Sequence, residues 1–139
     1  MQVVAFAPAS SAVVDENGGV NIDGFPLTSC HIDHFPKRIT IPLVLAAYTQ
    51  GGTEYDLCRY IVAKSPDGER LGTAECTWHW PDQPGAPVKF WVLTRNLPIV
   101  VQSAGLYSVG LYDSPDATQT DHLFPLPVVK FNPLIPPRP

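Results

Sequence analysis

The sequence predicts an all-β protein in which two antiparallel sheets pack against each other as a sandwich. Sixteen prolines are spread over the 139 residues, and the longest interval without one runs from 43 to 65. A proline inside a helix costs about 3 kcal/mol, and Gly51-Gly52 divides even this interval, so long helices are excluded. The apolar residues instead form short runs bounded by turn residues, which is typical of all-β domains. We count eight or nine such runs, enough strands for two sheets.

The first runs are a hairpin and a long alternating strand. In "AVVDENGGVNI" (12–22), Asn17-Gly18 tolerates the positive φ angles of a tight hairpin turn. In "RITIPLVLAAY" (38–48), every second residue from Ile39 to Ala47 is apolar. Because successive side chains of a strand point to opposite faces, these residues share one face, which we expect to be buried.

The middle of the chain predicts two strands joined by a turn. The strand "EYDLCRYIVAK" (54–64) is followed by "SPDG" (65–68) and then by the strand "ERLGTAECTWHW" (69–80). In the turn, proline presets φ, and Asp67-Gly68 supplies the residues that complete it. This segment therefore predicts a second hairpin.

Three further runs complete the expected strands. They are "VKFWVLT" (88–94), "LYSVGLY" (106–112) and "DHLFPLPVVKF" (121–131). Pro125 and Pro127 lack the N–H group that a central strand needs, so the last strand is expected at a sheet edge.

Length and composition limit the domain organisation and the partners. We expect one domain, residues 1–130, followed by an extended proline-rich tail, 131–139. The formal net charge is −4, and Lys37-Arg38 is the only adjacent basic pair, so no nucleic-acid partner is expected. Charged residues are 16% of the chain, against about 25% in typical domains, so part of the surface should be apolar.

The sequence also bears on location. No apolar run approaches the roughly 18 residues that span a bilayer, so no membrane partner is expected. The first residues lack a basic region and include Pro8, so no signal peptide is recognised. The three cysteines are odd in number and lack C-x-x-C spacing, which fits reduced thiols. We therefore expect a cytoplasmic location or assembly into a particle.

Several motifs together resemble a known family. The segment "AGLYSVGLY" (104–112) has a glycine followed two residues later by Tyr107 and then by alternating apolar positions. With "VVDENGGVNIDGF", "FPKRITIPLVLAAY" and "SPDGERLG", it resembles a family of short bacterial immunoglobulin-like β-sandwich proteins of uncharacterised function, over roughly residues 3–129. The resemblance implies that Tyr107 is a tyrosine-corner residue, buried with its hydroxyl bonded to nearby backbone. It implies no catalytic residues.

The segment "TSCHIDHFPKR" (28–38) is the densest cluster of chemically active side chains. In an extended strand, His31 and Asp33 would share one side, while Cys30 and His34 would lie on the other, about 13 Å apart. That distance is too long for one zinc ion, and two ligands are too few. We therefore predict no metal site, no cofactor and no catalytic site, and consider the segment a polar connection between strands.

The tryptophans permit two interpretations. Trp78 and Trp80 lie on the same side of a strand, where they would fill the core or form an exposed stacking platform for a sugar. In "VKFWVLT", Phe90 and Val92 share one face and Trp91 and Leu93 the other, so both faces are apolar. A strand that is apolar on both faces is buried on both, and we expect Trp91 and Leu93 to face a partner.

The functional prediction follows from these features. We expect a non-enzymatic structural or protein-interaction sandwich in a homo-oligomer or larger assembly, such as a viral or cellular particle. Its predicted interface contains Trp91 and Leu93 with the apolar tail residues Pro133, Leu134, Ile135 and Pro136. The alternative is a carbohydrate-binding module that uses Trp78, Trp80 or Trp91 as its platform. Exposed tryptophans in a groove would favour sugar binding, whereas buried tryptophans would favour assembly.

Overall fold

The computed structural model describes residues 1–17, 19–50, 57–81 and 84–131, and these residues form strands and turns without a helix. Nothing in this part of the chain is a helix of the length and apolarity that crossing a membrane requires. The strands, in chain order, are β1 (Gln2–Pro8), β2 (Ser11–Val14), β3 (Val20–Asp23), β4 (Cys30–Ile32), β5 (Lys37–Gln50), β6 (Leu57–Lys64), β7 (Arg70–Trp78), β8 (Val88–Val101), β9 (Gly105–Tyr112) and β10 (His122–Lys130).

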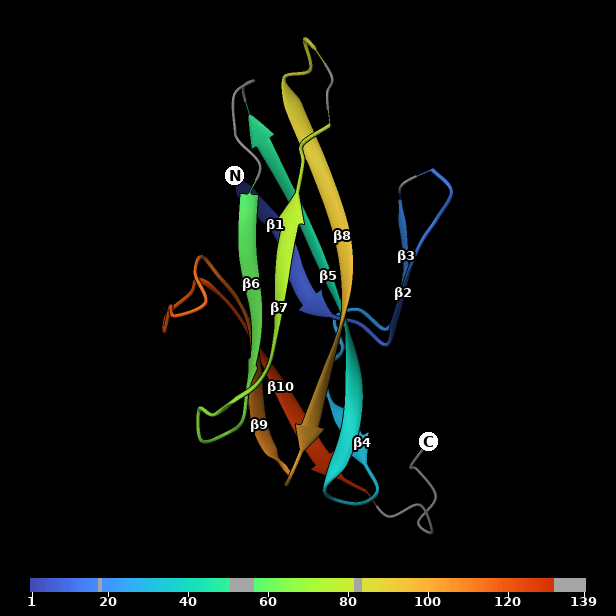
Figure 1. Ribbon diagram of the computed structural model, residues 1–139. Coiled ribbons are helices and arrows are strands. Elements are labelled where there is room, and N and C mark those ends of the chain that lie inside the picture. The colour runs from blue at the N-terminus through green and yellow to red at the C-terminus, as the bar shows by residue number, and fades with distance from the viewer. Residues whose placement is uncertain (18, 51–56, 82–83, 132–139) are drawn as a thin grey trace.

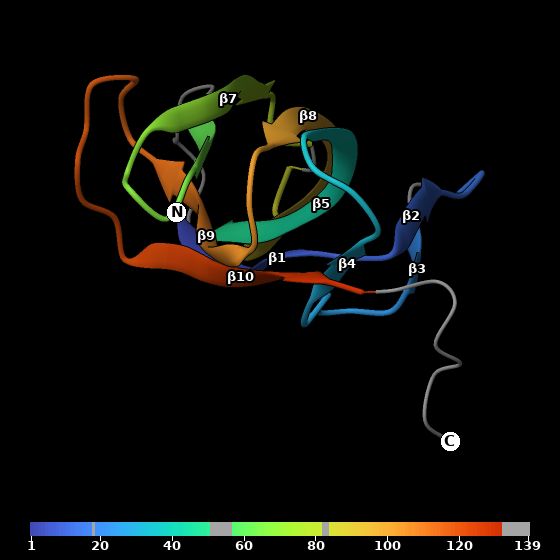
Figure 2. The same cartoon turned by 90° about the horizontal axis from the view of Figure 1, so that it is seen from below.

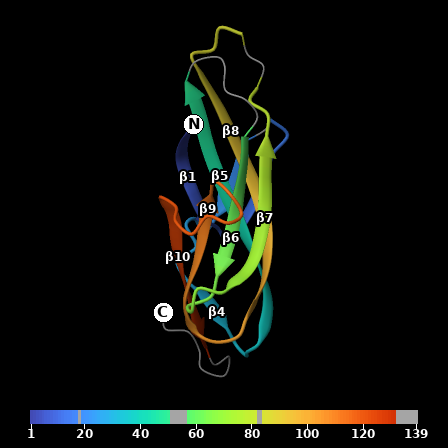
Figure 3. The same ribbon diagram turned by 60° about the vertical axis from the view of Figure 1, so that its left-hand side comes forward.

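The strands form three sheets. One has the order β1-β5-β8, a second has the order β4-β10-β9-β6-β7, and β2 pairs with β3 as a separate hairpin. All pairings are antiparallel except the short parallel pairing of β4 with the end of β10. The two larger sheets face each other, and the β2–β3 hairpin extends away from them (Figures 1 and 2). The strands β5 and β8 run along most of the length of the molecule (Figure 3).

The core lies between the two larger sheets. The predicted apolar face of β5 is confirmed, because Ile41, Leu43, Leu45 and Ala47 are buried and Ile39 packs against them. This face meets the inner face of the second sheet. The residues of that sheet that join the core are Ile32, Ile61, Ala63, Cys76, Trp78, Tyr107, Val109, Leu111, Leu126 and Val128.

The two large sheets come close together where Gly72 of β7 lies against the C-terminal half of β8. A Cβ atom on Gly72 would lie 3.0 Å from the carbonyl oxygen of Pro98 and 3.1 Å from the side chain of Ile99, so a larger residue would push β8 away by a few tenths of an ångström. A hydrogen bond from the Arg95 guanidinium to the Glu75 carbonyl oxygen lies in the same region. The backbone edge of β8 is therefore covered by β7 near residues 95–99.

Two turns have the expected residues, and one of them has the expected geometry. The Gly68 amide donates to the Ser65 carbonyl at 2.9 Å and Gly68 has a φ of 86°, so the predicted turn at 65–68 is confirmed. The first hairpin forms as predicted, but Val14 pairs with Val20 and five residues separate the strands instead of two. Gly18 lies outside the described residues.

The first hairpin turn is organised by Asp15, which the sequence analysis did not identify. Its carboxylate accepts hydrogen bonds from the backbone amides of Asn17 at 2.9 Å and Gly19 at 2.8 Å. An aspartate that binds the amides following it in this way stabilises a wider turn.

The strand count and one edge assignment need correction. The structure has ten strands in the described residues, because β1 and β4 were not expected, and β8 is longer than expected because it continues through residues 95–101. Pro98 is tolerated within this strand because β8 is the outermost strand of its sheet. β10 is not outermost, because β4 pairs with residues 128–130, although Pro125 and Pro127 precede that pairing. The start of the predicted strand 54–64 and Gly51-Gly52 lie outside the described residues.

The base of the β2–β3 hairpin covers part of the outer face of the β1-β5-β8 sheet. Val44 points away from the core, yet it is buried, as are Ala7 and Ala9 next to it. Ala9 donates a backbone hydrogen bond to the Pro42 carbonyl at 2.9 Å, which fixes the start of the hairpin on β5. The outer face is left uncovered further along β5 and β8.

Tyr107 has the environment that the sequence predicts. Its ring is buried, and its hydroxyl donates a 2.8 Å hydrogen bond to the carbonyl oxygen of Ser103, in the loop before β9. This bond ties the connection between the two sheets to the core.

We expect Tyr107→Phe to lower the free energy of unfolding by about 1–2 kcal/mol, because the Ser103 carbonyl loses its hydroxyl partner. Urea denaturation measures this change. Ser103→Ala is the control, since it keeps the carbonyl and should leave the midpoint almost unchanged. An unchanged midpoint for Tyr107→Phe would contradict the structural role of the bond.

Candidate functional site

The polar cluster at 30–34 does not converge on one point. Cys30 packs against the core, and His31 is exposed on β4, where its ring bonds the Ser29 hydroxyl at 3.1 Å. β4 ends at Ile32, and the chain then bends. Asp33 therefore faces Lys37 and His34, at 2.9 Å from each, and the expected pairing of His31 with Asp33 on one side of a strand is wrong.

The cysteines of the described chain do not resemble nucleophiles. Burial raises the pKa of the Cys30 thiol, and burial is also the main cause of the raised pKa of Cys76. Both thiols therefore stay protonated at neutral pH, whereas a nucleophilic cysteine needs a lowered pKa. Cys58 donates to the Glu75 carboxylate at 3.4 Å, on the outer face of β6 and β7.

Within residues 1–17, 19–50, 57–81 and 84–131, no three histidine, cysteine or acidic side chains are grouped closely enough to hold a metal ion. The absence of a metal site and of a cofactor remains a prediction.

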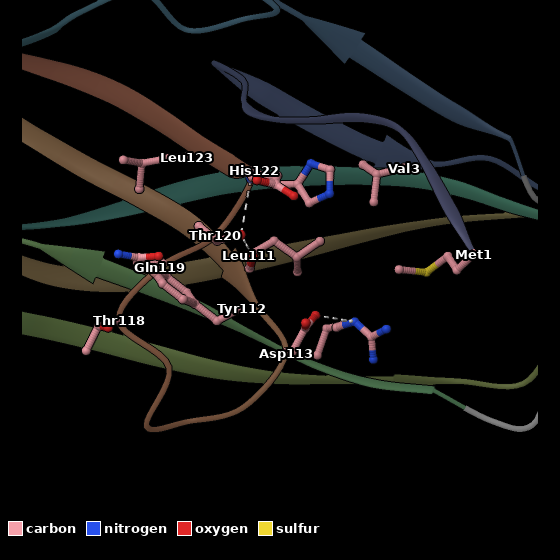
Figure 4. Close-up of a pocket in the computed structure, with 12 residues that line it drawn as sticks. Met1, Val3, Leu111, Tyr112, Asp113, Thr118, Gln119, Thr120, His122 and Leu123 are labelled. Atoms are coloured by element: carbon pink, nitrogen blue, oxygen red, sulfur yellow. Dashed lines mark hydrogen bonds and ion pairs between the residues drawn. The ribbon is translucent and has the colours of Figure 1, made fainter.

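A polar cavity of about 640 Å³ lies where the N-terminus meets β6 and the loop between β9 and β10. Figure 4 shows the side chains that line it. The Arg59 guanidinium bonds the Asp113 carboxylate at 3.2 Å and the Cys58 carbonyl at 2.9 Å. The Thr120 hydroxyl bonds the Leu111 carbonyl and accepts the His122 amide.

These interactions give the cavity a structural role. They hold the loop 113–121 against β6 and β9, and the charge of Arg59 is balanced by Asp113.

The tryptophans predicted as a possible sugar platform are in the core. Trp78 and Trp80 are each 4% exposed, and their rings meet edge to face with centroids 5.9 Å apart. A sugar stacks on an open ring face, so Trp78 and Trp80 cannot form that platform. The core interpretation is confirmed.

The predicted orientation of the 88–94 strand is wrong. Trp91 and Leu93 pack against the core, whereas Phe90 is 61% exposed and Val92 38% exposed. The cause is the register with β5: Leu93 pairs with the buried Leu45, and Val92 pairs with Ala46 on the outer face. The predicted interface residues Pro133, Leu134, Ile135 and Pro136 lie outside the described residues.

An apolar groove of about 580 Å³ follows the uncovered part of β8. Val14, which is 53% exposed, faces it from the hairpin. Its lining consists of Val14, Pro81, Phe90, Trp91, Val92, Leu93 and Thr94, none of which is charged. We call this surface the β8 groove.

The β8 groove is the site that sequence reasoning identified only in part. A signal for it was present: Leu97, Ile99 and Val101 continue the alternation of Trp91 and Leu93. Extending the strand to residue 101 would have assigned the odd-numbered residues to the core and Phe90 and Val92 to the surface.

Comparisons of this chain with protein-family models, with curated proteins and with solved structures found no match.

We expect Asp33 to titrate far below an ordinary carboxyl group. The hydrogen bond from Lys37 is the main reason that its pKa falls from 3.8 to about 2. A lowered pKa in the folded state means that the contribution to stability is present above pH 4 and is lost as the pH falls through about 2. NMR titration of the Asp33 carboxyl carbon measures this directly. Lys37→Met should raise the pKa more than His34→Ala does, and an equal effect would contradict the assignment.

We predict that the cluster containing His31 and Asp33 binds no metal. Elemental analysis of protein purified without a histidine tag should give well under one equivalent of zinc, iron, copper or manganese. One equivalent that disappears in a His31→Ala, Asp33→Ala variant would overturn this prediction.

Proposed function

We propose that this chain is a non-enzymatic, immunoglobulin-like β-sandwich that self-associates, and that the β8 groove is its contact surface. The observation that carries the proposal is the uncovered apolar border of β8, where the exposed side chains of Phe90, Val92 and Val14 line one groove. Contiguous exposed apolar surface of this kind marks interaction sites.

Strand order supports the immunoglobulin-like part of the proposal. The orders β1-β5-β8 and β10-β9-β6-β7 match the A-B-E and G-F-C arrangement of such sandwiches, with β7 as an added strand. Tyr107 lies at the start of β9, the equivalent of strand F, and bonds backbone four residues upstream. Both features are consistent with the tyrosine corner.

A contact role fits the chemistry of the described residues better than catalysis does. The side chains of the 30–34 cluster point to different neighbours, and burial raises the pKa values of Cys30 and Cys76. The burial of Trp78 and Trp80 removes the main support for sugar binding. Phe90, Val92 and Val14 remain exposed at the β8 groove, and exposed apolar surface costs free energy in water.

Phe90→Lys should weaken self-association at least tenfold. Burying a phenylalanine contributes about 1.5–3 kcal/mol, and 1.4 kcal/mol corresponds to a factor of ten. Light scattering at two concentrations should give a mass above 15.2 kDa that rises with concentration for the unsubstituted chain, and about 15.2 kDa for Phe90→Lys.

Leu106→Lys is the matched control for this experiment. Leu106 is 60% exposed, almost the same as Phe90, but it lies on the outer face of the other large sheet. Its substitution should leave the mass unchanged. If the unsubstituted chain has a mass of 15.2 kDa at both concentrations, the proposed function is wrong.

A further inference from the structure

The β8 groove follows the backbone edge of a strand. Its lining includes every residue from Phe90 to Thr94, whose side chains alternate between the inner and outer faces of the sheet. A groove that borders consecutive residues must run along the edge that they share. β8 is the outermost strand of its sheet, and the contacts that the structure shows between β8 and β7 involve Arg95 and residues 97–99.

Such an edge is suited to an extended apolar segment. An exposed strand edge presents N–H and C=O groups that pair with another chain. The groove lining is uncharged, so a charged segment would lose its hydration there without a partner. The occupant should therefore be extended, apolar and without charge.

The chain itself carries a segment of this composition, which lies outside the described residues. Residues 132–136 read "NPLIP" and contain no charge. In an extended segment, Asn132 and Leu134 direct their amides to one side, whereas Pro133, which has no amide hydrogen, occupies the opposite side. Two donors could thus face the β8 edge while Leu134 and Ile135 supply apolar contacts.

The segment is too short to reach the groove of its own molecule. Val128 pairs with Gly105, four residues after the end of β8, and the Phe131 amide bonds the Ile32 carbonyl at 3.0 Å. Phe131 therefore lies at the end of the molecule where β8 finishes, opposite the end where β8 begins (Figure 1). Val92 and Val101 are nine residues apart in β8, which corresponds to about 30 Å at 3.3 Å per residue.

The reach of the segment is smaller than this gap. Pro136 is five residues beyond Phe131, and five extended residues span at most about 18 Å. We propose that residues 132–136 of one copy lie along the β8 edge of a second copy, in the groove formed by Val14 and Phe90–Thr94. This inference rests on the proposed function and names the segment that fills the groove.

The donor and the acceptor can be separated in two full-length variants. Val92→Lys places a charge in the groove and leaves residues 132–136 intact, so it provides a donor. The double variant Leu134→Asp, Ile135→Asp leaves the groove intact and removes the apolar character of the segment, so it provides an acceptor. Sedimentation velocity should give a mass of about 15.2 kDa for each variant alone, and twice that mass for an equimolar mixture.

A control tests whether the groove is specific. Leu106→Lys should retain the self-association of the unsubstituted chain, because Leu106 lies on the other sheet. A mixture of the acceptor with a chain that carries both the Val92→Lys and the Leu134→Asp, Ile135→Asp changes should remain at the mass of one chain.

The outcomes distinguish this inference from the proposed function. If Val92→Lys abolishes association and the Leu134→Asp, Ile135→Asp variant associates like the unsubstituted chain, another segment fills the groove, and only the inference is wrong. If the unsubstituted chain is monomeric and its tryptophan fluorescence changes in the Leu134→Asp, Ile135→Asp variant, the segment folds back on its own molecule, and both the inference and the proposed function are wrong. If every variant behaves as the unsubstituted monomer, both the inference and the proposed function are wrong.

Discussion

The buried face of β5 is the constraint on which the rest of this structure depends. Ile41, Leu43, Leu45 and Ala47 are each almost fully buried, and they contact residues from both large sheets. At roughly 1.5–3 kcal/mol for each large apolar side chain, this face fixes which side of β5 points inward. A shift of one residue in register would turn all of these side chains to solvent.

The exposure of the β8 groove follows from this constraint. β5 and β8 pair over fourteen residues each, so the orientation of β5 determines the orientation of β8. Leu93, Leu97 and Ile99 join the core, and Phe90 and Val92 must then face outward. β7 lies close to β8 at Gly72, whereas the border at residues 90–94 lines an open groove. The apolar surface is thus a consequence of core packing.

Local patterns in the sequence predict much of the fold. Proline and glycine spacing predicts an all-β chain, the alternation in β5 predicts its buried face, and "SPDG" predicts its turn. The burial of Tyr107 also follows from its pattern. These features depend on neighbours in the chain, where backbone geometry and side-chain periodicity act directly.

Other features depend on partners that are distant in the chain. Both faces of the 88–94 segment are apolar, so this segment taken alone does not show whether Trp91 or Phe90 is exposed, and only the longer alternation through Val101 does. In the structure Phe90 pairs with Tyr48 and Trp91 pairs with the buried Ala47. This register turns Trp91 toward the core and Phe90 toward solvent. The expected alternation of His31 and Asp33 fails because the parallel pairing of β4 with β10 ends at Ile32, after which Asp33 turns toward Lys37.

Hydrogen–deuterium exchange at two protein concentrations tests the central claim that the border of β8 is covered by another chain in solution. The account predicts that amide exchange at residues 90–94 slows as the concentration rises, while exchange at 106–112, in the other sheet, does not change. Exchange at 90–94 that is fast and independent of concentration would show that this border stays open to water, and would contradict the account.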